Sequence, residues 1–285
     1  MEKNYRAELV GCFGDPVDGN PTGVMEEAAF AAAGLNYRYI TAKVCAGDLE
    51  AAFAGIKAMN FRGINLTMPH KIRIIPLLDG LGTSASIIGA VNTVVNRDGK
   101  WIGENSDGKG FVEALQRQGC SLQGRNVTIL GAGGAARAIA VESALAGAAS
   151  ITIINRSPES GQALAELIRS NTPAQSRYLP WTPAVRIPEG TQILVNATCV
   201  GFDQDREQAP DIDYTTISAG TYVSDVVFNP VDPLFLRKAR EQGAKTISGT
   251  GMLAQQGAIN FTLWTGQPAP LEVMYQALEA EFAES

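Results

Sequence analysis

Histidine and cysteine are scarce in this sequence. It contains one histidine, His70, and four cysteines, Cys12, Cys45, Cys120 and Cys199, which form no CxxC pair. Zinc sites need several closely spaced histidine or cysteine ligands, so no metal site is predicted, and the cysteine spacing indicates no disulfide framework. The single histidine and the lack of a serine in a nucleophile-elbow pattern also argue against Ser-His-Asp chemistry.

An excess of positive charge and long apolar runs are missing as well. The formal net charge of −6 disfavours nucleic acid or an anionic membrane as the principal partner. No apolar run approaches the length needed to cross a membrane, and the first residues, MEKNYRAELVG, lack the hydrophobic segment of a signal peptide. We therefore expect a cytoplasmic protein.

The composition is that of a globular protein, with 285 residues of which 45% are hydrophobic and 18% charged. This length suits one large core or two ordinary ones, and we expect two domains. Apolar, strand-like runs alternate with helix-like stretches, which predicts an α/β protein. The predicted strands cover 7–13, 37–43, 63–67, 151–154, 193–197, 222–227 and 245–248, and the predicted helices cover 24–33, 49–59, 135–146, 252–266 and 271–283. The alternation restarts near Asp107, where we place the domain boundary.

The run VTILGAGGAARA, from Val127 to Ala138, is the most informative motif. It reads as a short apolar strand that breaks into glycines and then opens a small-residue helix. Gly131 permits the tight turn, Gly133 allows backbone to approach a pyrophosphate, and Ala136 occupies the third small position. Glycine-rich turns also occur where no ligand binds, but the second strand at 151–154 completes a βαβ unit of the right length and favours a dinucleotide site.

Small polar residues gather after the predicted strands of the first half. The segment GINLTMPHK contributes Asn65, Thr67 and Lys71, AVNTVV contributes Asn92, and GENSDGKGF contributes Asp107. Ligands of open α/β sheets collect at the carboxyl ends of strands, so we expect these residues to line a cleft between the domains.

Taken together, NLTMPHK, GAVNTVV, GENSDGKGF, GAGGAARA, NRS, NATCVG and GTGMLAQQGA resemble, in this order and spacing, the shikimate dehydrogenase family. The resemblance covers nearly the whole chain. It implies an N-terminal α/β substrate domain, residues 1–107 plus 252–285, and a Rossmann-type dinucleotide-binding domain, residues 108–251, with the C-terminal helix returning to the first domain. The implied activity is hydride transfer between a nicotinamide cofactor and a cyclic hydroxy-carboxylate in the shikimate pathway of aromatic amino acid biosynthesis, by a monomer or homodimer.

By the family's pattern, Lys71 and Asp107 form the catalytic pair. Oxidation of a secondary alcohol needs a base for the hydroxyl proton, and the reverse reaction needs a donor at the carbonyl oxygen. A lysine serves both needs, while a neighbouring carboxylate orients the amine. Taken without the resemblance, Lys71 reads as a solvated lysine at a helix start and Asp107 as a turn residue. The sequence leaves open whether Lys71 carries the proton or chiefly stabilises charge.

The resemblance also assigns substrate-binding residues. Asn65, Thr67 and Asn92 could instead satisfy backbone groups at strand ends. Adjacent helical residues point about 100° apart, so only one of Gln255 and Gln256 should face the cleft, and the family pattern selects Gln256. The predicted substrate set is Asn20, Thr22, Asn65, Thr67, Asn92 and Gln256.

The chain departs from the family where the substrate carboxylate should bind. The usual Ser-x-Ser-Pro followed by histidine is replaced by Asn20-Pro21-Thr22-Gly23 and Glu26, and a usual tyrosine is Phe228. Unmatched polar groups cost about 1 to 3 kcal/mol, enough to change a substrate preference. These departures favour a paralogue that acts poorly on shikimate, or that prefers quinate, an amino-substituted relative or an unrelated hydroxy acid. Conservative drift with function kept, and a weakly catalytic NAD-binding sensor, are the alternatives.

The cofactor choice rests on the loop after the second Rossmann strand. Arg156 could pair with a 2′-phosphate or stack on adenine, whereas Glu159 would repel phosphate. This balance favours NAD, with NADP possible. The predicted cofactor-binding residues are Gly131, Ala132, Gly133, Gly134, Ala135, Asn155, Arg156, Ser157, Thr198, Val226, Gly249 and Met252.

Overall fold

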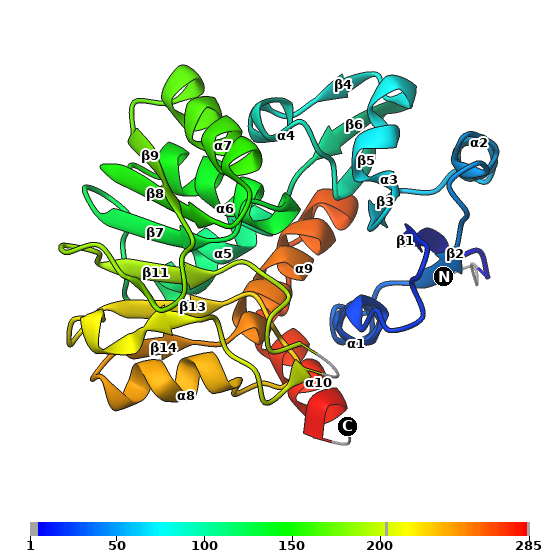
Figure 1. The fold of residues 1–285 in the computed structure, drawn as a ribbon. Helices are drawn as coiled ribbons and strands as arrows, with labels where there is room; N and C mark the ends of the chain where they lie inside the picture. Colours follow the sequence, from blue (N-terminus) through cyan, green and yellow to red (C-terminus); the bar gives the residue numbers. More distant parts are fainter. Residues whose placement is uncertain (1–4, 203–204, 284–285) are drawn as a thin grey trace. The chain divides into compact units, whose positions relative to one another are not determined.

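The computed structural model describes residues 5–202 and 205–283 of the chain (Figure 1). The first four residues of the N-terminal segment, considered above for a signal peptide, lie outside the described residues. The chain divides into two compact units, Met1–Ser106 with Gln256–Ser285, and Asp107–Gln255. Each unit is built on its own β-sheet, so the two-domain α/β architecture predicted from the sequence is confirmed.

The first unit contains a mixed six-stranded sheet in the order β2-β1-β3-β5-β6-β4. Strand β1 pairs in parallel with β2 and β3, whereas β5 runs antiparallel to both β3 and β6, and β4 pairs in parallel with β6. The strands are β1 (Glu8–Gly14), β2 (Tyr37–Lys43), β3 (Gly63–Leu66), β4 (Gly80–Leu81), β5 (Thr93–Arg97) and β6 (Lys100–Glu104).

Apolar residues from the strands and helices of this unit form its core. Phe53 and Ile56 of one helix pack with Ile64 and Val94 of the sheet, and the Phe53 and Trp101 rings meet edge to face at a centroid distance of 5.3 Å. The final helix packs against the first, as predicted for a C-terminal helix that returns to the substrate domain. The helices are α1 (Thr22–Ala32), α2 (Leu49–Ala58), α3 (His70–Arg73), η1 (Ile75–Leu77), α4 (Thr83–Ile88) and α10 (Leu271–Ala283).

The second unit contains a parallel six-stranded sheet in the order β14-β13-β11-β7-β8-β9, and a short parallel pair, β10 with β12. Its strands are β7 (Asn126–Leu130), β8 (Ser150–Asn155), β9 (Gln175–Pro180), β10 (Val185–Arg186), β11 (Ile193–Asn196), β12 (Ile212–Asp213), β13 (Tyr222–Asp225) and β14 (Lys245–Ile247). The central strands are buried on both faces, which explains why 193–196 reads as an almost unbroken apolar run.

The helices of the second unit are α5 (Asp107–Arg117), α6 (Gly134–Leu145), α7 (Pro158–Asn171), η3 (Tyr214–Thr216) and α8 (Leu234–Glu241). Three of them, α6, α7 and α8, connect successive strands of the parallel sheet, and α5 precedes its first strand. Helix α9 (Gly249–Thr265) begins in this unit and continues through residue 256 into the segment assigned to the first. The two units meet at 106/107 and 255/256, while the sequence-based domain boundaries, 107/108 and 251/252, stay a prediction.

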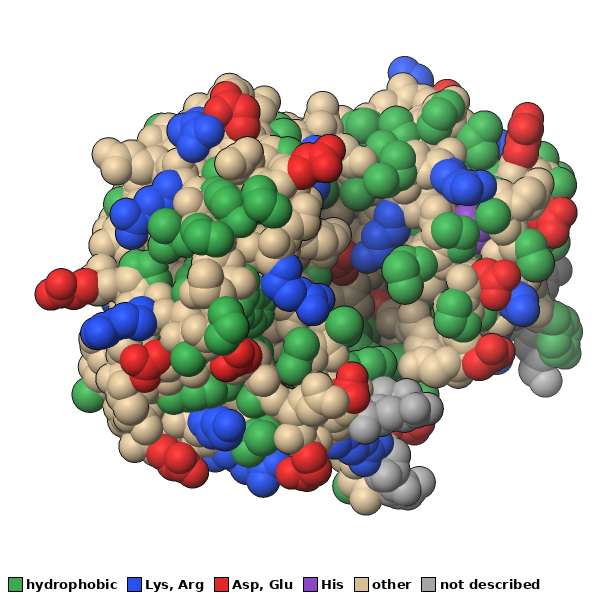
Figure 2. Space-filling model, viewed as in Figure 1, with side chains coloured by type: hydrophobic (Ala, Val, Ile, Leu, Met, Phe, Trp, Pro, Cys, Tyr) green, Lys and Arg blue, Asp and Glu red, His purple; other side chains and the backbone are tan. Residues whose placement is uncertain are grey.

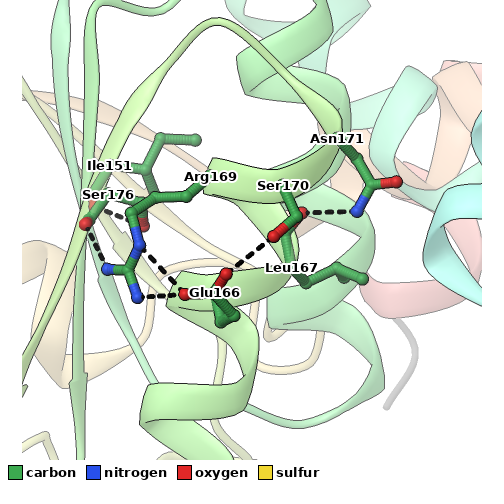
Figure 3. Close-up of polar contacts among 7 residues, drawn as sticks. All are labelled: Ile151, Glu166, Leu167, Arg169, Ser170, Asn171 and Ser176. Carbon is green, nitrogen blue, oxygen red and sulfur yellow. Dashed lines mark hydrogen bonds and ion pairs between the residues drawn. The ribbon is translucent and has the colours of Figure 1, made fainter.

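A polar cluster ties α7 to the edge strand β9 (Figure 3). Arg169 donates from Nη1 to the carbonyl of Ser176 at 2.8 Å and from Nε to Glu166 at 3.2 Å. Ser170 donates to the other oxygen of Glu166 at 2.7 Å, and these hydrogen bonds lower the pKa of Glu166. The helix thus covers one backbone carbonyl at an edge that would otherwise be open to water.

The surface of the described residues fits the charge balance of the sequence. On the face in view, basic and acidic side chains are interspersed (Figure 2). Within residues 5–202 and 205–283, no helix combines the length and apolar character required to cross a bilayer.

Candidate functional site

Asn92 organises a buried polar network in the first unit. Its side chain is 3% exposed and precedes β5. The Asn92 Oδ1 accepts from the backbone N–H of Ser106 at 2.7 Å, while the Asn92 Nδ2 donates to the Ser106 Oγ at 2.9 Å. Thr93 donates to the same Oδ1 at 3.0 Å. Asn92 thereby fixes the residue that immediately precedes Asp107.

Helix α9 adds two amides to this network. Ser106 donates to the Oε1 of Gln256 at 3.4 Å, and Asn260 donates to the same oxygen at 3.2 Å. The Thr93 hydroxyl lies 2.8 Å from the Asn260 Oδ1, and Asn65 donates to the Thr93 Oγ1 at 3.1 Å. The structure therefore brings together three predicted substrate residues, Asn65, Asn92 and Gln256, through Thr93, Ser106 and Asn260.

Lys71 lies on the short helix α3 and is half-buried. Its backbone carbonyl accepts from the N–H of Val91 at 2.8 Å, so the Val91–Asn92 dipeptide holds both Lys71 and the residue before Asp107. The charge of Lys71 also acts on Cys12: burial raises the pKa of the Cys12 thiol to about 12, and Lys71 opposes that rise. The amine therefore lies near Cys12 of β1.

Asn20 and Thr22 lie together at the start of α1. The Asn20 Oδ1 accepts from the Thr22 N–H at 2.9 Å, and the Asn20 Nδ2 donates to the Cys12 Sγ at 3.5 Å. Thr67 is half-buried after β3, and it packs so close to Gly14 that a Cβ there would lie 2.1 Å from the Thr67 Cγ2. Glycine at position 14 is therefore required beside Thr67.

Tyr39 on β2 joins Asn20 and Thr22 to the network around Asn92. Its hydroxyl donates to the Asn65 Oδ1 at 2.9 Å, and the Thr22 side chain lies near this hydroxyl and lowers its pKa. Burial raises the pKa of Tyr39 well above its ordinary value, so the phenol stays protonated and keeps its donor. The sequence did not point to Tyr39 or Asn260, because isolated polar residues in a strand or helix carry no motif, and within AVNTVV it pointed to Asn92 rather than to Thr93.

His70, which precedes Lys71, has a structural partner. Its side chain is fully buried, and the Nε2 lies 2.7 Å from the carbonyl oxygen of Val44. This contact anchors α3 to the segment after β2. The imidazole thereby helps to fix the backbone that carries Lys71.

In the second unit, the turn between β7 and α6 fits a dinucleotide pyrophosphate. Gly131 has φ +106°, and a Cβ there would lie 3.0 Å from the Thr198 Cγ2, so this position needs glycine. Gly133 and Gly134 are exposed, and a Cβ at either would meet nothing within 4 Å. The N-cap residue of α6 is Gly133, which has no side chain to cap the first turn, so the backbone N–H groups there are available to an anion. Ala132 and Ala135 flank these glycines.

The loop after β8 holds the residues predicted to contact the adenosine ribose. Asn155 donates to the carbonyl of Ser157 at 2.9 Å and to the hydroxyl of Ser160 at 2.8 Å, while the Ser157 side chain caps α7. Arg156 and Glu159 are exposed. The loop is thus held by its own hydrogen bonds, with a cation and an anion facing solvent.

The carboxyl ends of β11 and β13 contain a second buried polar group. Asn196 donates to the Asp225 Oδ1 at 2.9 Å, and the Thr198 hydroxyl donates to the Asn196 Oδ1 at 2.7 Å. Burial raises the pKa of Asp225 to about 7, although hydrogen bonds from Val227, Asn196 and Val226 oppose the rise. The Asp225 Oδ2 is buried and has no hydrogen-bond partner among the described residues.

Of the remaining predicted cofactor residues, Val226 donates its N–H to the Asn196 carbonyl at 3.0 Å. Gly249 begins α9 so close to the end of β13 that a Cβ would lie 2.3 Å from the Val227 carbonyl oxygen. Met252 lies in the first turns of α9 and is half-buried. Val226 and Gly249 thus lie at the same end of the parallel sheet as Asn196 and Asp225.

Family models match three parts of the chain. Residues 12–94 match the shikimate dehydrogenase substrate binding domain, residues 113–198 match shikimate / quinate 5-dehydrogenase, and residues 249–279 match the shikimate 5-dehydrogenase C-terminal domain. A shikimate dehydrogenase (NADP(+)) of Desulforamulus reducens is 39% identical over 285 residues, covering 99% of this chain and 98% of the relative. The chain belongs to the shikimate dehydrogenase family.

Solved structures of this family superimpose on nearly the whole chain. Ligand-free 5-ketofructose reductase of Gluconobacter sp. strain CHM43 is 44% identical, with a TM-score of 0.94 and coverage of 98% of this chain and 100% of the other. Shikimate 5-dehydrogenase of Listeria monocytogenes, in complex with shikimate and NAD, is 34% identical, with a TM-score of 0.90 and coverage of 98% and 99%. The chain is thus an oxidoreductase of the shikimate dehydrogenase family, and its relatives include a reductase with a different substrate.

Proposed function

We propose that this protein transfers a hydride between NAD(P) and a secondary alcohol of a small polyhydroxylated substrate, with Lys71 and Asp107 as the catalytic pair. The observation that carries the proposal is the hydrogen-bonded path from Asn92 to Ser106 and from Val91 to Lys71, which fixes the backbone on which both residues are mounted. When bound, the nicotinamide ring supplies the hydride acceptor or donor.

The protein's own residues would handle the proton and the substrate. The Lys71 amine takes the hydroxyl proton during oxidation and returns it to the carbonyl oxygen during reduction, and the Asp107 carboxylate orients it. Asn65, Asn92 and Gln256 belong to one hydrogen-bonded network that holds their amide groups in place. These amides would form hydrogen bonds with the hydroxyl groups of the substrate. Asn20, Thr22 and Thr67 complete the proposed substrate set.

The first candidate substrate is shikimate, quinate or a close analogue, with 3-dehydroshikimate or 3-dehydroquinate as the ketone. It is supported by the family and by the shikimate complex of the Listeria relative. The second candidate is a neutral sugar ketone such as 5-ketofructose. The 44% identity to the Gluconobacter reductase favours it, as does the replacement of a usual serine hydroxyl by the Asn20 amide.

For the cofactor we propose NAD, with NADP also accepted. The glycine turn fits the shared pyrophosphate, and Arg156 is the cation that the loop after β8 offers to a 2′-phosphate, with Glu159 three residues away in sequence opposing it. We also propose a cytoplasmic monomer or homodimer, supported by the scattered cysteines and the absence of a sequence motif for another partner.

A substrate panel tests the proposal. Purified protein is assayed with NAD and NADP against shikimate, quinate and 5-ketofructose, and Lys71→Ala is compared with Arg73→Ala on the same short helix. Lys71→Ala should lower kcat by at least about 100-fold, the usual contribution of general acid–base catalysis, while the dinucleotide Kd stays within about threefold. Wild-type turnover in Lys71→Ala would remove the amine from the mechanism, and dinucleotide binding without turnover of any substrate would favour the sensor alternative.

A further inference from the structure

Glu26 is a buried acid for which the described part of the chain provides no hydrogen-bond partner. It lies on α1 and is 0% exposed, and both carboxyl oxygens lack a hydrogen bond to any described residue. Burial raises its pKa well above the ordinary value, so the group resists ionisation. A buried carboxyl group without a partner is destabilising, and an apolar residue of similar size would fit this position at lower cost. Stability of the fold alone therefore does not account for Glu26.

The surroundings of Glu26 connect it to the proposed substrate residues. Thr22 lies one helical turn before it, and the Thr22 side chain lies near the Tyr39 hydroxyl, whose pKa it lowers. Negative charge on Glu26 or Cys12 raises the pKa of Tyr39, which shows that both lie close to the phenol. Glu26 therefore lies next to three residues, Asn20, Thr22 and Tyr39, which we call the Asn20 group.

Other titratable residues on neighbouring elements complete the electrostatic environment. Helix α10, which packs against α1, carries Glu272, Tyr275, Glu279 and Glu281, and the sequence of α9 contains no titratable residue. The adjacent Glu27 accepts from the backbone N–H of Tyr39. The positive charge of Lys71 reaches this region, because it acts on Cys12.

The hydrogen-bonding capacity of the Asn20 group suits a hydroxyl better than a carboxylate. The Asn20 oxygen accepts from the Thr22 N–H, one Asn20 N–H is directed to Cys12, and the Thr22 side chain lies near the Tyr39 hydroxyl. A carboxylate accepts hydrogen bonds only and would place a second acid beside Glu26. A substrate hydroxyl both donates and accepts, and it brings no charge.

We propose that Glu26 sets the substrate class of this site, favouring an uncharged polyhydroxylated carbonyl compound over a carboxylate. The inference rests on the proposed function, because it concerns the same substrate site. Glu26 is a positioning residue that acts through Thr22 and Tyr39. A bound carboxylate would hold Glu26 in its protonated form, so carboxylate affinity falls once the pH is high enough to ionise it, whereas affinity for a neutral substrate does not.

The test compares Glu26→Gln with Glu27→Gln, the matched loss of a carboxyl group one residue along α1. Steady-state constants are measured with 5-ketofructose as the neutral probe and with shikimate and quinate as carboxylate probes. At a pH high enough to ionise Glu26, Glu26→Gln should lower KM for the carboxylates about tenfold, the equivalent of one pKa unit, with kcat nearly unchanged and with the wild-type kcat and KM for 5-ketofructose. At a pH where Glu26 is protonated, the variant and the wild type should have the same KM for the carboxylates. Glu27→Gln should leave the ratio of the two classes unchanged.

A measurement on the wild-type protein tests the proposal even if Glu26→Gln does not fold. The inhibition constants of shikimate and of a neutral polyol are measured from pH 5.5 to pH 9; that of shikimate should rise with pH and that of the polyol should stay level. Parallel pH profiles, or an unchanged substrate ratio in folded Glu26→Gln, overturn the role of Glu26 alone. Wild-type protein that binds dinucleotide yet turns over no probe overturns the proposed function and this inference with it.

Discussion

The Asn92 side chain makes two hydrogen bonds to Ser106: its Oδ1 accepts from the backbone N–H at 2.7 Å, and its Nδ2 donates to the hydroxyl at 2.9 Å. Ser106 is fully buried, and the next residue is Asp107. One amide therefore fixes the main chain at the point where the proposed catalytic carboxylate begins α5. This relationship gives Asn92 a positioning role that is distinct from substrate contact.

Asn92→Ala tests that role. The variant leaves the Ser106 N–H buried without its acceptor, so we expect a loss of about 1 to 3 kcal/mol in unfolding free energy and at least a tenfold fall in kcat. Asn96→Ala is the control, because Asn96 accepts from the Gly99 N–H at 2.8 Å in the same sheet, away from Ser106. Urea denaturation and steady-state kinetics separate the two effects. An equal fall in kcat for both variants would contradict a specific role for Asn92.

The glycine turn makes a prediction that does not depend on turnover. Gly133 is exposed and has open space where an alanine methyl group would stand, so Gly133→Ala should keep its stability but bind dinucleotide at least tenfold more weakly, because the methyl obstructs the pyrophosphate. Gly131→Ala should instead lose at least about 1 kcal/mol of stability, since φ is +106° and Thr198 is in contact. Fluorescence titration with NADH and urea denaturation measure the two quantities. Undiminished NADH affinity in Gly133→Ala would remove the pyrophosphate from this turn.

Glu159→Arg should move the cofactor preference toward NADP. The change removes an exposed anion and adds a second cation near Arg156, and a 2′-phosphate pairs well with guanidinium groups. Relative to wild type, kcat/KM for NADP over NAD should rise about tenfold or more. Glu159→Gln, which removes the charge without adding one, should give a smaller rise. If the ratio of kcat/KM for NADP to kcat/KM for NAD were identical in all three proteins, the loop after β8 would not contribute to recognition of the 2′-phosphate.

Asp225 should make stability fall as the pH rises. Its folded pKa is about 7 against an ordinary 3.8, so the folded protein holds a proton that the unfolded chain releases between these values. The stabilisation is complete below pH 4 and is lost as the pH rises through 7, with an upper bound of roughly 4 kcal/mol for a shift of this size. Urea denaturation should therefore show Asp225→Asn gaining on wild type between pH 4.5 and pH 7.5. The exposed Asp48→Asn serves as control; a constant difference between Asp225→Asn and wild type would contradict the raised pKa.

Much of the fold was predictable because its elements carry periodic apolar patterns. The strand predicted at 37–43 coincides with β2, and those at 63–67 and 222–227 overlap β3 and β13 with ends one or two residues different. The edge strand β9 was missed, since a sequence with Arg177 and Pro180 lacks a buried apolar face. The hairpin of β5 and β6 was also missed as a pair, although AVNTVV was noted for Asn92. Antiparallel strands interrupt the parallel alternation on which the prediction was based.

The candidate site was predictable where motifs exist and not elsewhere. The motifs pointed to Asn65, Asn92 and Gln256, and the structure joins them in one network, while their contact with substrate stays a prediction. Gln255 and Gln256 are both 7% exposed, so burial does not distinguish them. The lack of partners around Glu26 within the described residues could not be read from the sequence, because it depends on how α1 packs against β2. Its replacement of the family's histidine was the only sequence signal.

Because the first unit is formed from two separate segments of the chain, the two units become able to fold at different stages of synthesis. Residues 107–255 form one uninterrupted segment, whereas the first unit is incomplete until Gln256 and α10 have been made. Until then α1 has no α10 packed against it, and the network around Asn92 lacks the Gln256 and Asn260 amides. A chain truncated after residue 255 should accordingly show a protease-resistant second unit and a first unit that is readily digested.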